Sequence, residues 1–373
     1  MNCLKIGILS SWVLLLTFQL PSAEVDSLFH CYLLFGQSNM AGGGAGNNDG
    51  EGTNGVGDYC DTNSRVKVLA WGDCNATPYP CPQMQLQRTH DQWYTAFPPY
   101  HNCHEGIGPA DGFGRTLLDS IREDITIGFI PCALSGQEIA VYKKGGGGSI
   151  ESWTQPTPSI GNDGYSWMVR RCRIAQETGV IKGILFHQGE ADNGRSEWTA
   201  DVKGIVDNLK EDLGLWDSIP FIAGELRYDG CCPGHNTLVN QLPGMIPNCA
   251  VASADGLERR LSRTDGQYDQ YHFSTKGFKD FGFRFAEAFL NLVDQEYMPR
   301  INTTASSPKT IPVKKPPLEF SWNKPVNIYT LNGRFVATVT SRNQMAGYLS
   351  SGNLYILSNN TRNTGTAGLF LKY

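Results

Sequence analysis

The chain has 373 residues, of which 40% are apolar and 18% are charged, a balance that supports a sizeable hydrophobic core. This length suits one large domain with an appendage. The net charge of −5 gives the chain no electrostatic reason to hold nucleic acid or an anionic membrane, so a neutral substrate fits better.

The N-terminal segment 1–23 has the layout of a secretory signal peptide. Lys5 precedes an apolar run over 6–20, and the small-residue segment 21–23 follows it. The run is too short and wrongly flanked for a stable membrane anchor, although Pro21 makes the cleavage site imperfect and leaves an uncleaved anchor open. We therefore expect a secreted, extracellular protein without membrane contact after leader cleavage.

The segment 24–300 alternates short apolar runs with amphipathic stretches. The runs are bounded by Gly, Pro or polar residues, as buried parallel strands are. The predicted strands are 31–35, 125–130, 181–186, 220–223 and 249–252. The predicted helices are 114–122, 165–178, 197–213 and 275–293. This alternation predicts an α/β fold with a parallel sheet, right-handed crossovers and a ligand site at the carboxyl ends of the strands.

A long insertion at 42–108 has no helical period and is rich in Gly, Asn and Pro. A loop of this length without regular structure is usually functional. Its aromatic residues suit stacking on sugars, and Trp93, Tyr94 and Tyr100 are the candidate substrate-binding residues. The alternative is that these rings form a satellite core beneath disulfides.

Eleven cysteines are present, and Cys3 leaves with the leader. The even number that remains favours up to five disulfides in an exported chain, with buried free thiols as the alternative. No C-x-x-C pair indicates a zinc site. The adjacent Cys231 and Cys232 are expected to bond to different partners.

A change in composition to Thr, Ser, Pro and Lys at 301–318 is typical of a linker. Beyond it, 319–373 is patterned as β structure, since 326–330 and 334–338 flank an Asn-Gly pair, a strong hairpin signal. The Gly-Arg-Phe hairpin and the closing Leu-Phe-Leu-Lys-Tyr loosely resemble the sorting tails of secreted proteins in gliding and fibre-degrading bacteria. We expect a C-terminal β module that serves a secretion or sorting machinery or targets the substrate.

Ser38 lies in the sequence Phe-Gly-Gln-Ser-Asn-Met, which ends the first predicted strand. A serine in a tight strand-to-helix turn is exposed with its backbone N–H beside it, as a nucleophile requires. Gly36 permits the sharp turn because glycine takes positive φ without steric cost. A Gly-x-Ser turn is also common without any catalytic role.

The sequence Phe-His-Gln-Gly-Glu-Ala-Asp over 186–192 ends the third predicted strand. The amide of Gln188 there could donate to a developing oxyanion. His187 is either a base or a structural hydrogen-bonding residue. Glu190 and Asp192 suggest either a glycosidase carboxylate pair or hydrogen-bonding support behind the site.

Asp269 and His272 lie three residues apart, just before the last predicted helix. This spacing lets a carboxylate accept a hydrogen bond from one imidazole nitrogen and free the other as a general base. The alternative is that His272 caps the following helix.

Together, the Gly-Gln-Ser-Asn-Met, His-Gln-Gly-Glu-x-Asp and Asp-x-x-His-Phe blocks resemble those of the SGNH hydrolases. They are most similar to the sialate O-acetylesterase-like group, which contains the carbohydrate esterase family 6 acetylxylan esterases, and the resemblance covers 29–292. It implies a three-layer α/β/α, flavodoxin-like fold that needs no metal or cofactor. It also implies that Ser38 is the nucleophile, His272 the base and Asp269 the residue that orients the base.

The resemblance further implies an oxyanion hole made of the Ser38 and Gly136 N–H groups and the Gln188 amide. His187 and Glu190 would support it from behind. One block departs from the family pattern, because Gly-Gly-Thr-Ser-Ile is replaced after Gly136 by Gln137 and Glu138. This change places a carboxylate near the site and leaves the backbone donor intact.

The sequence therefore predicts a secreted serine esterase that removes O-acetyl groups from a plant polysaccharide, with acetylated xylan as the expected substrate. A sialate O-acetylesterase is one alternative. A non-catalytic carbohydrate-binding protein on the same scaffold is another, although it would have no need to retain Ser, Asp and His together.

Overall fold

The computed structural model divides into two compact units, Met1–Ile301 and Asn302–Tyr373. The leader predicted at 1–23 and the linker predicted at 301–318 lie outside the described residues. Those described in full are 25–43, 60–76, 81, 84–261 and 267–293, and the backbone of four further strands is described in the second unit.

Seven strands form the main sheet of the first unit. They are β1 (Phe29–Gly36), β2 (Val66–Leu69), β5 (Trp93–Thr95), β6 (Thr126–Pro131), β7 (Val180–His187), β8 (Phe221–Gly224) and β9 (Cys249–Ala252). Their order is β5-β2-β6-β1-β7-β8-β9, and every neighbouring pair is parallel except β2 with the edge strand β5. The five strands that the sequence predicted thus follow the flavodoxin-like order 2-1-3-4-5, with β1 between β6 and β7.

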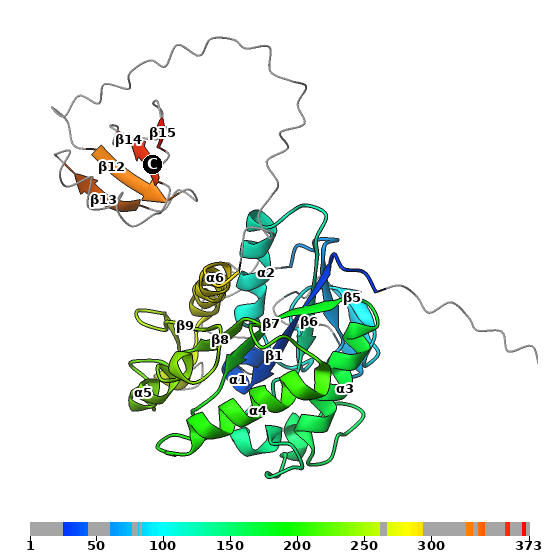
Figure 1. Cartoon of the computed structure of the whole chain (residues 1–373). Helices are drawn as coiled ribbons and strands as arrows, with labels where there is room; N and C mark the ends of the chain where they lie inside the picture. The colour runs from blue at the N-terminus through cyan, green and yellow to red at the C-terminus, as the bar shows by residue number, and fades with distance from the viewer. Residues whose placement is uncertain are drawn as a thin grey trace, which may run out of the picture. The chain divides into compact units, whose positions relative to one another are not determined.

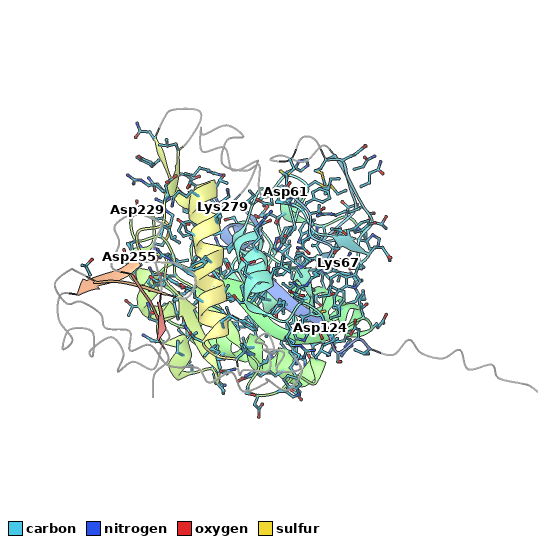
Figure 2. The ribbon with its side chains drawn as sticks, turned by 90° about the horizontal axis from the view of Figure 1, so that it is seen from above. Asp61, Lys67, Asp124, Asp229, Asp255 and Lys279 are labelled. Carbon is cyan, nitrogen blue, oxygen red and sulfur yellow. A yellow bond between two sulfur atoms is a disulfide. The ribbon has the colours of Figure 1, made fainter. Side chains whose placement is uncertain are left out.

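Four long helices cover the sheet. They are α2 (Pro109–Ser120), α3 (Gly164–Gln176), α4 (Trp198–Leu213) and α6 (Thr275–Leu290). Helices α2 and α6 lie on one face and α3 and α4 on the other (Figure 1), so the predicted three-layer α/β/α architecture is confirmed. Figure 2, which labels Lys279 on α6, shows α6 and α2 side by side. Among the described helices, none is long and apolar enough to span a membrane.

The central strand β1 divides the core into two clusters, one on each face of the sheet. Leu33 and Phe35 belong to the cluster beneath α3 and α4, whereas Tyr32 and Leu34 belong to the cluster beneath α2 and α6. Successive side chains of a strand point to opposite faces, so a continuous apolar run serves both clusters. Strand β1 is therefore almost wholly buried. The first polar side chains after it, those of Gln37 and Ser38, follow at its carboxyl end.

The insertion at 42–108 contains regular structure that the sequence analysis did not predict. Strands β2 and β5 extend the main sheet, and β3 (Cys74–Ala76) pairs with β4 (Leu86–Arg88) in a separate small sheet. Strands of three or four residues offer too little alternation to be recognised from sequence. The expectation of a loop without regular structure is therefore wrong for 60–108, and 44–59 lie outside the described residues.

Shorter elements complete the first unit near the carboxyl ends of the strands. Helix α1 (Ser38–Ala41) follows β1, and α5 (Asn236–Val239) follows β8. Strands β10 (Arg259–Leu261) and β11 (Tyr268–Phe273) form an antiparallel pair that leads into α6. Ser274 caps that helix, since its hydroxyl oxygen accepts a hydrogen bond from the Gly277 N–H at 3.0 Å.

Three disulfides are formed among the described residues, fewer than the five that the sequence allowed. They join Cys60 to Cys81, Cys74 to Cys103 and Cys231 to Cys232. The expectation that the adjacent Cys231 and Cys232 bond to different partners is wrong, because they bond to each other. The four other cysteines of the described residues are free thiols, namely Cys31, Cys132, Cys172 and Cys249.

We expect thiol titration of the denatured, unreduced, leader-free protein to find four thiols per chain. The native protein should react far more slowly, because three of these cysteines are buried and burial raises the pKa of Cys132 to about 11. A denatured chain without free thiols would restore the five-disulfide expectation and contradict the pairing described here.

The second unit contains a four-stranded antiparallel sheet in the order β13-β12-β14-β15. Its strands are β12 (Val326–Thr330), β13 (Phe335–Val339), β14 (Tyr355–Ser358) and β15 (Gly368–Phe370). The predicted hairpin is confirmed, since β12 and β13 pair across the Asn-Gly segment. This unit is thus the small β module that the sequence predicted.

Candidate active site

Ser38 lies at the carboxyl end of β1, where the chain turns sharply into α1. Gly36 makes this turn with φ of +129°, and a Cβ atom there would lie 2.0 Å from the carbonyl oxygen of His187. Only glycine fits such a position. The Gln37 N–H donates to the same carbonyl at 2.9 Å, which ties the turn to β7. Ser38 is therefore held where the strand order reverses, the usual ligand position in such sheets.

The structure brings Ser38, His272 and Asp269 into one hydrogen-bonded chain. The Nε2 atom of His272 lies 2.9 Å from the Ser38 hydroxyl oxygen, and its Nδ1 lies 3.0 Å from Oδ2 of Asp269. Because a carboxylate only accepts, the imidazole proton sits on Nδ1 and the Nε2 lone pair faces the Ser38 hydroxyl. The arrangement can therefore withdraw the hydroxyl proton and make Ser38 a nucleophile.

Asp269 is held in its ionised form. Burial by itself raises the pKa of this carboxyl, but hydrogen bonds from His272 and from the N–H groups of Tyr271 and His272 outweigh it, so the pKa lies well below its usual range. The two backbone bonds reach Oδ1 at 2.7 and 3.0 Å. Asp269 consequently stays a carboxylate at any pH at which an esterase would be assayed.

Two arginines that sequence reasoning missed hold the loop of Asp269 and His272. Arg260 forms an ion pair with Oδ2 of Asp269 and also donates to the carbonyl of Gly43. Arg227, whose side chain is buried, donates to the carbonyls of Asp269 and His272. Neither position carries a recognisable local signal, because β10 and the loop after β8 meet β11 only in the folded chain.

The two residues whose backbone N–H groups the sequence predicts as oxyanion donors both line the cavity beside Ser38. The N–H of Ser38 is the first of helix α1 and so has no acceptor within the helix. That of Gly136 lies in the turn after β6, where Gly136 has φ of +73°. The two residues follow the neighbouring strands β1 and β6, and their role as oxyanion donors stays a prediction.

Gln188 does not take the predicted place in the oxyanion hole. Its side chain is fully buried, and its Nε2 donates to Asp192 and, at 3.4 Å, to the carbonyl of Gln137. Its Oε1 accepts from the Trp198 indole at 2.5 Å, which fixes the orientation of the amide. With both N–H groups directed at protein acceptors, Gln188 braces the turn after β7 instead of lining the cavity.

Behind the nucleophile, Asn39 joins the two halves of the site. Its buried side-chain amide donates to Oε1 of Glu190 at 2.6 Å and to the carbonyl of Tyr271 at 2.9 Å. Glu190 and Asn39 thus hold α1 against the loop of His272. The supporting position expected for Glu190 agrees with this geometry, whereas the role of Asn39 is visible only in the structure.

His187 is a buried structural residue. Its Nε2 donates to the carbonyl of Glu225 at 3.0 Å, and burial lowers its pKa, so the ring stays neutral. Asp192 is equally buried and accepts from the Ile139 N–H at 2.7 Å and from Arg195. A glycosidase pair of Glu190 and Asp192 is therefore wrong, because only Glu190 reaches the cavity.

A cavity of about 400 Å³ opens beside Ser38. Besides Ser38, Gly136, Glu190 and His272, the lining includes six residues that the sequence did not identify as site residues, and they are Gln37, Glu105, Ser135, Trp153, Ala191 and Tyr271. The Ser135 hydroxyl donates to the carboxylate of Glu105. For Trp153, the sequence offers one indication of a role in the site, which is a tryptophan that follows a Gly-rich stretch. Within the described residues, no group of three or more His, Cys, Asp or Glu side chains could hold a metal ion.

The prediction that Trp93, Tyr94 and Tyr100 bind substrate is wrong, because none of them lines the cavity beside Ser38. Trp93 packs edge-on against Phe29 at 5.0 Å, Tyr100 packs against Phe129 at 5.4 Å, and Tyr94 contacts the same core cluster as Tyr100. They belong to the packing of the insertion, which is the alternative that the sequence left open.

The carboxylate expected near the site from Glu138 is also misplaced. Glu138 is exposed and does not line the cavity, whereas its neighbour Gln137 is buried. The carboxylates that do reach the cavity are Glu105 and Glu190.

Comparison with known proteins places this site in a family. Residues 28–291 match the model of the carbohydrate esterase, sialic acid-specific acetylesterase family. A probable carbohydrate esterase of Arabidopsis thaliana is 25% identical over 273 residues, which cover 70% of this chain and 90% of that protein.

A solved structure agrees with the fold. The crystal structure of an Arabidopsis thaliana protein superposes with a TM-score of 0.50 at 22% identity, covering 70% of this chain and 98% of that one. A carbohydrate acetylesterase from Xanthomonas citri gives 0.48 at 17% identity, covering 70% and 56%. The family match spans both the Ser38 turn and the loop of Asp269 and His272. The chain therefore belongs to the carbohydrate esterase, sialic acid-specific acetylesterase family.

Proposed function

We propose that this carbohydrate esterase is a secreted serine esterase of the carbohydrate esterase family 6 type, which removes acetyl groups from a plant polysaccharide such as acetylated xylan. The observation that carries the proposal is the hydrogen-bonded chain from the Ser38 hydroxyl through His272 to Asp269, which opens into a cavity. The layout of an export signal, which the sequence predicts at 1–23, supports secretion.

In the proposed reaction, the Ser38 oxygen attacks the acetyl carbonyl carbon while its proton passes to Nε2 of His272. The tetrahedral oxyanion is bound by the N–H groups of Ser38 and Gly136, and one such donor contributes about 3 kcal/mol to lowering the barrier. The bond to the sugar oxygen then breaks, and His272 returns the proton to that oxygen. Water repeats the sequence on the acetyl-enzyme, releases acetate and regenerates the Ser38 hydroxyl.

The charge of the cavity supports a neutral glycan over a sialic acid. The carboxylates of Glu105 and Glu190 line it, and its described lining contains no Lys or Arg side chain. The carboxylate of a sialic acid would meet like charge there without a cationic partner. The sialate O-acetylesterase remains the second candidate because of the family's description. A purely carbohydrate-binding role is disfavoured by the complete Ser38, His272 and Asp269 chain.

The test compares acetate release from acetylated xylan with release from O-acetylated sialic acid by the wild-type protein. We expect kcat/KM on the xylan substrate to exceed that on the sialate by at least about tenfold. Equal or reversed preference would favour the sialate candidate. Binding of acetylated xylan without any acetate release would favour the binding role.

We also propose that the C-terminal unit serves export sorting or substrate targeting and takes no part in catalysis. Truncation after Arg300 should leave kcat/KM on p-nitrophenyl acetate within about twofold of the wild-type value, because every residue of the proposed site precedes that point. Under sorting, the truncated protein stays in the secreting cell. Under targeting, it is exported and loses activity on insoluble xylan. Loss of activity on the small ester would contradict both roles.

A further inference from the structure

Two large aromatic side chains of the catalytic cavity are exposed to solvent. Trp153 is 63% exposed and Tyr271 is 50% exposed, and both line the cavity beside Ser38. The other aromatic rings with comparable exposure in the described part of the chain lie outside this cavity. An exposed apolar surface at a ligand cavity is more informative than a single exposed ring elsewhere on the surface, because it loses its water when a ligand binds.

Trp153 is presented by a braced segment. It lies in a short 3₁₀ turn, Ser152–Thr154, and its ring approaches to 3.1 Å from where a Cβ atom of Gly136 would lie. The side chain of Gln155 closes the loop by donating to the carbonyl of Gly161 at 2.6 Å and accepting from the Ile160 N–H at 3.0 Å. The loop itself is therefore ordered by its own hydrogen bonds, while the ring remains open to a ligand.

Tyr271 also lies in a segment held by hydrogen bonds, the loop that carries Asp269 and His272. Its N–H donates to Asp269 at 2.7 Å and its carbonyl accepts from Asn39 at 2.9 Å, so both backbone groups are fixed. Its ring centre lies 6.3 Å from that of His272. The ring therefore sits next to the group that protonates the leaving oxygen.

We propose that Trp153 and Tyr271 form an aromatic subsite that stacks on the pyranose rings of a neutral glycan chain. The proposal rests on the esterase function given above and names its sugar-binding residues. A pyranose ring exposes C–H bonds on one face, and these pack on an aromatic ring by dispersion and burial of apolar surface.

The reaction geometry orders the two contacts. Because His272 returns the proton to the sugar oxygen, the sugar that bears the ester lies nearest Tyr271. A Cβ atom on Gly136 would lie 3.1 Å from the Trp153 ring, so this ring lies beside the proposed oxyanion donor and away from Tyr271, and we assign it to an adjacent sugar of the chain. The substrate is thus an acetylated oligosaccharide or polysaccharide, and a single acetylated sugar uses only one of the two rings.

The test measures a selectivity ratio, defined as kcat/KM on acetylated xylo-oligosaccharides divided by kcat/KM on p-nitrophenyl acetate. We expect Trp153→Ala and Tyr271→Ala each to lower this ratio about tenfold or more, chiefly through a higher KM on the oligosaccharide. Trp153→Phe and Tyr271→Phe, which keep a ring, should retain most of it. Trp216→Ala is the matched control, because Trp216 is 58% exposed and stacks on Lys182 outside the cavity.

A second measurement is independent of turnover and of the acetyl group. Calorimetric binding of unacetylated xylohexaose to the Ser38→Ala variant should weaken about tenfold when Trp153→Ala or Tyr271→Ala is added, and Trp216→Ala should not change it. Wild-type selectivity and wild-type xylohexaose affinity in both Ala variants would overturn the subsite. Failure of the wild-type protein to release acetate from any glycan would instead overturn the proposed function, while the xylohexaose arm still decides the subsite.

Discussion

We expect the Ser38→Ala variant to lose esterase turnover by about 10⁶-fold while it remains folded. Removing the nucleophile of a triad leaves only binding and oxyanion stabilisation, and losses of this order follow. The substitution removes one oxygen whose recorded partner in the structure is Nε2 of His272, so the turn around Gly36 keeps its packing. The measurement is kcat on p-nitrophenyl acetate, with thermal unfolding of both proteins as the check on folding.

A serine-directed organophosphonate separates the nucleophile from other serines. The wild-type protein should be labelled on Ser38, and the Ser38→Ala variant should not be labelled. Ser166→Ala is the control, because Ser166 is an exposed residue of the first turn of α3, outside the cavity. If the Ser38→Ala variant retained more than about a tenth of wild-type turnover, the reaction would have another nucleophile.

The parts of the fold that the sequence predicted are those with long apolar runs. Each of the five predicted parallel strands is found, because these apolar runs lie wholly or partly buried between the two helix layers. The sequence could also predict that Ser38 and Gly136 lie close together, since they follow neighbouring parallel strands whose carboxyl ends meet at one edge of the sheet. The order of the strands along the chain and the parallel topology were enough for this prediction.

The parts that were missed depend on contacts between distant segments. Strands β2 and β5 are short and join the sheet from within the insertion. Arg260 acts on Asp269 through an ion pair that no spacing reveals, and Trp153 reaches the cavity from a loop after β6. For Gln188 the error runs the other way. Its place in a family block predicted that its amide donates to the oxyanion, whereas in the folded chain this amide donates to Asp192.

We expect Asp269→Asn to lower kcat by about 10⁴-fold. The Oδ1 atom of Asp269 accepts from the N–H groups of Tyr271 and His272, so the carbonyl oxygen of an asparagine would take that position. Its NH₂ group would then face Nδ1 of His272 and the guanidinium of Arg260. The imidazole could accept from this NH₂ only with its own proton on Nε2, which removes the base from Ser38.

The measurement is kcat on p-nitrophenyl acetate together with organophosphonate labelling of Ser38, which should slow in parallel because both reactions need the same base. Asp280→Asn is the matched control, since Asp280 forms an exposed ion pair with Lys276 on α6, away from the cavity. That variant should keep wild-type turnover. If Asp269→Asn retained more than about a tenth of wild-type kcat, Asp269 would not set the tautomer of His272, and its bonds to Arg260 and the backbone of Tyr271 would then serve only to hold the loop.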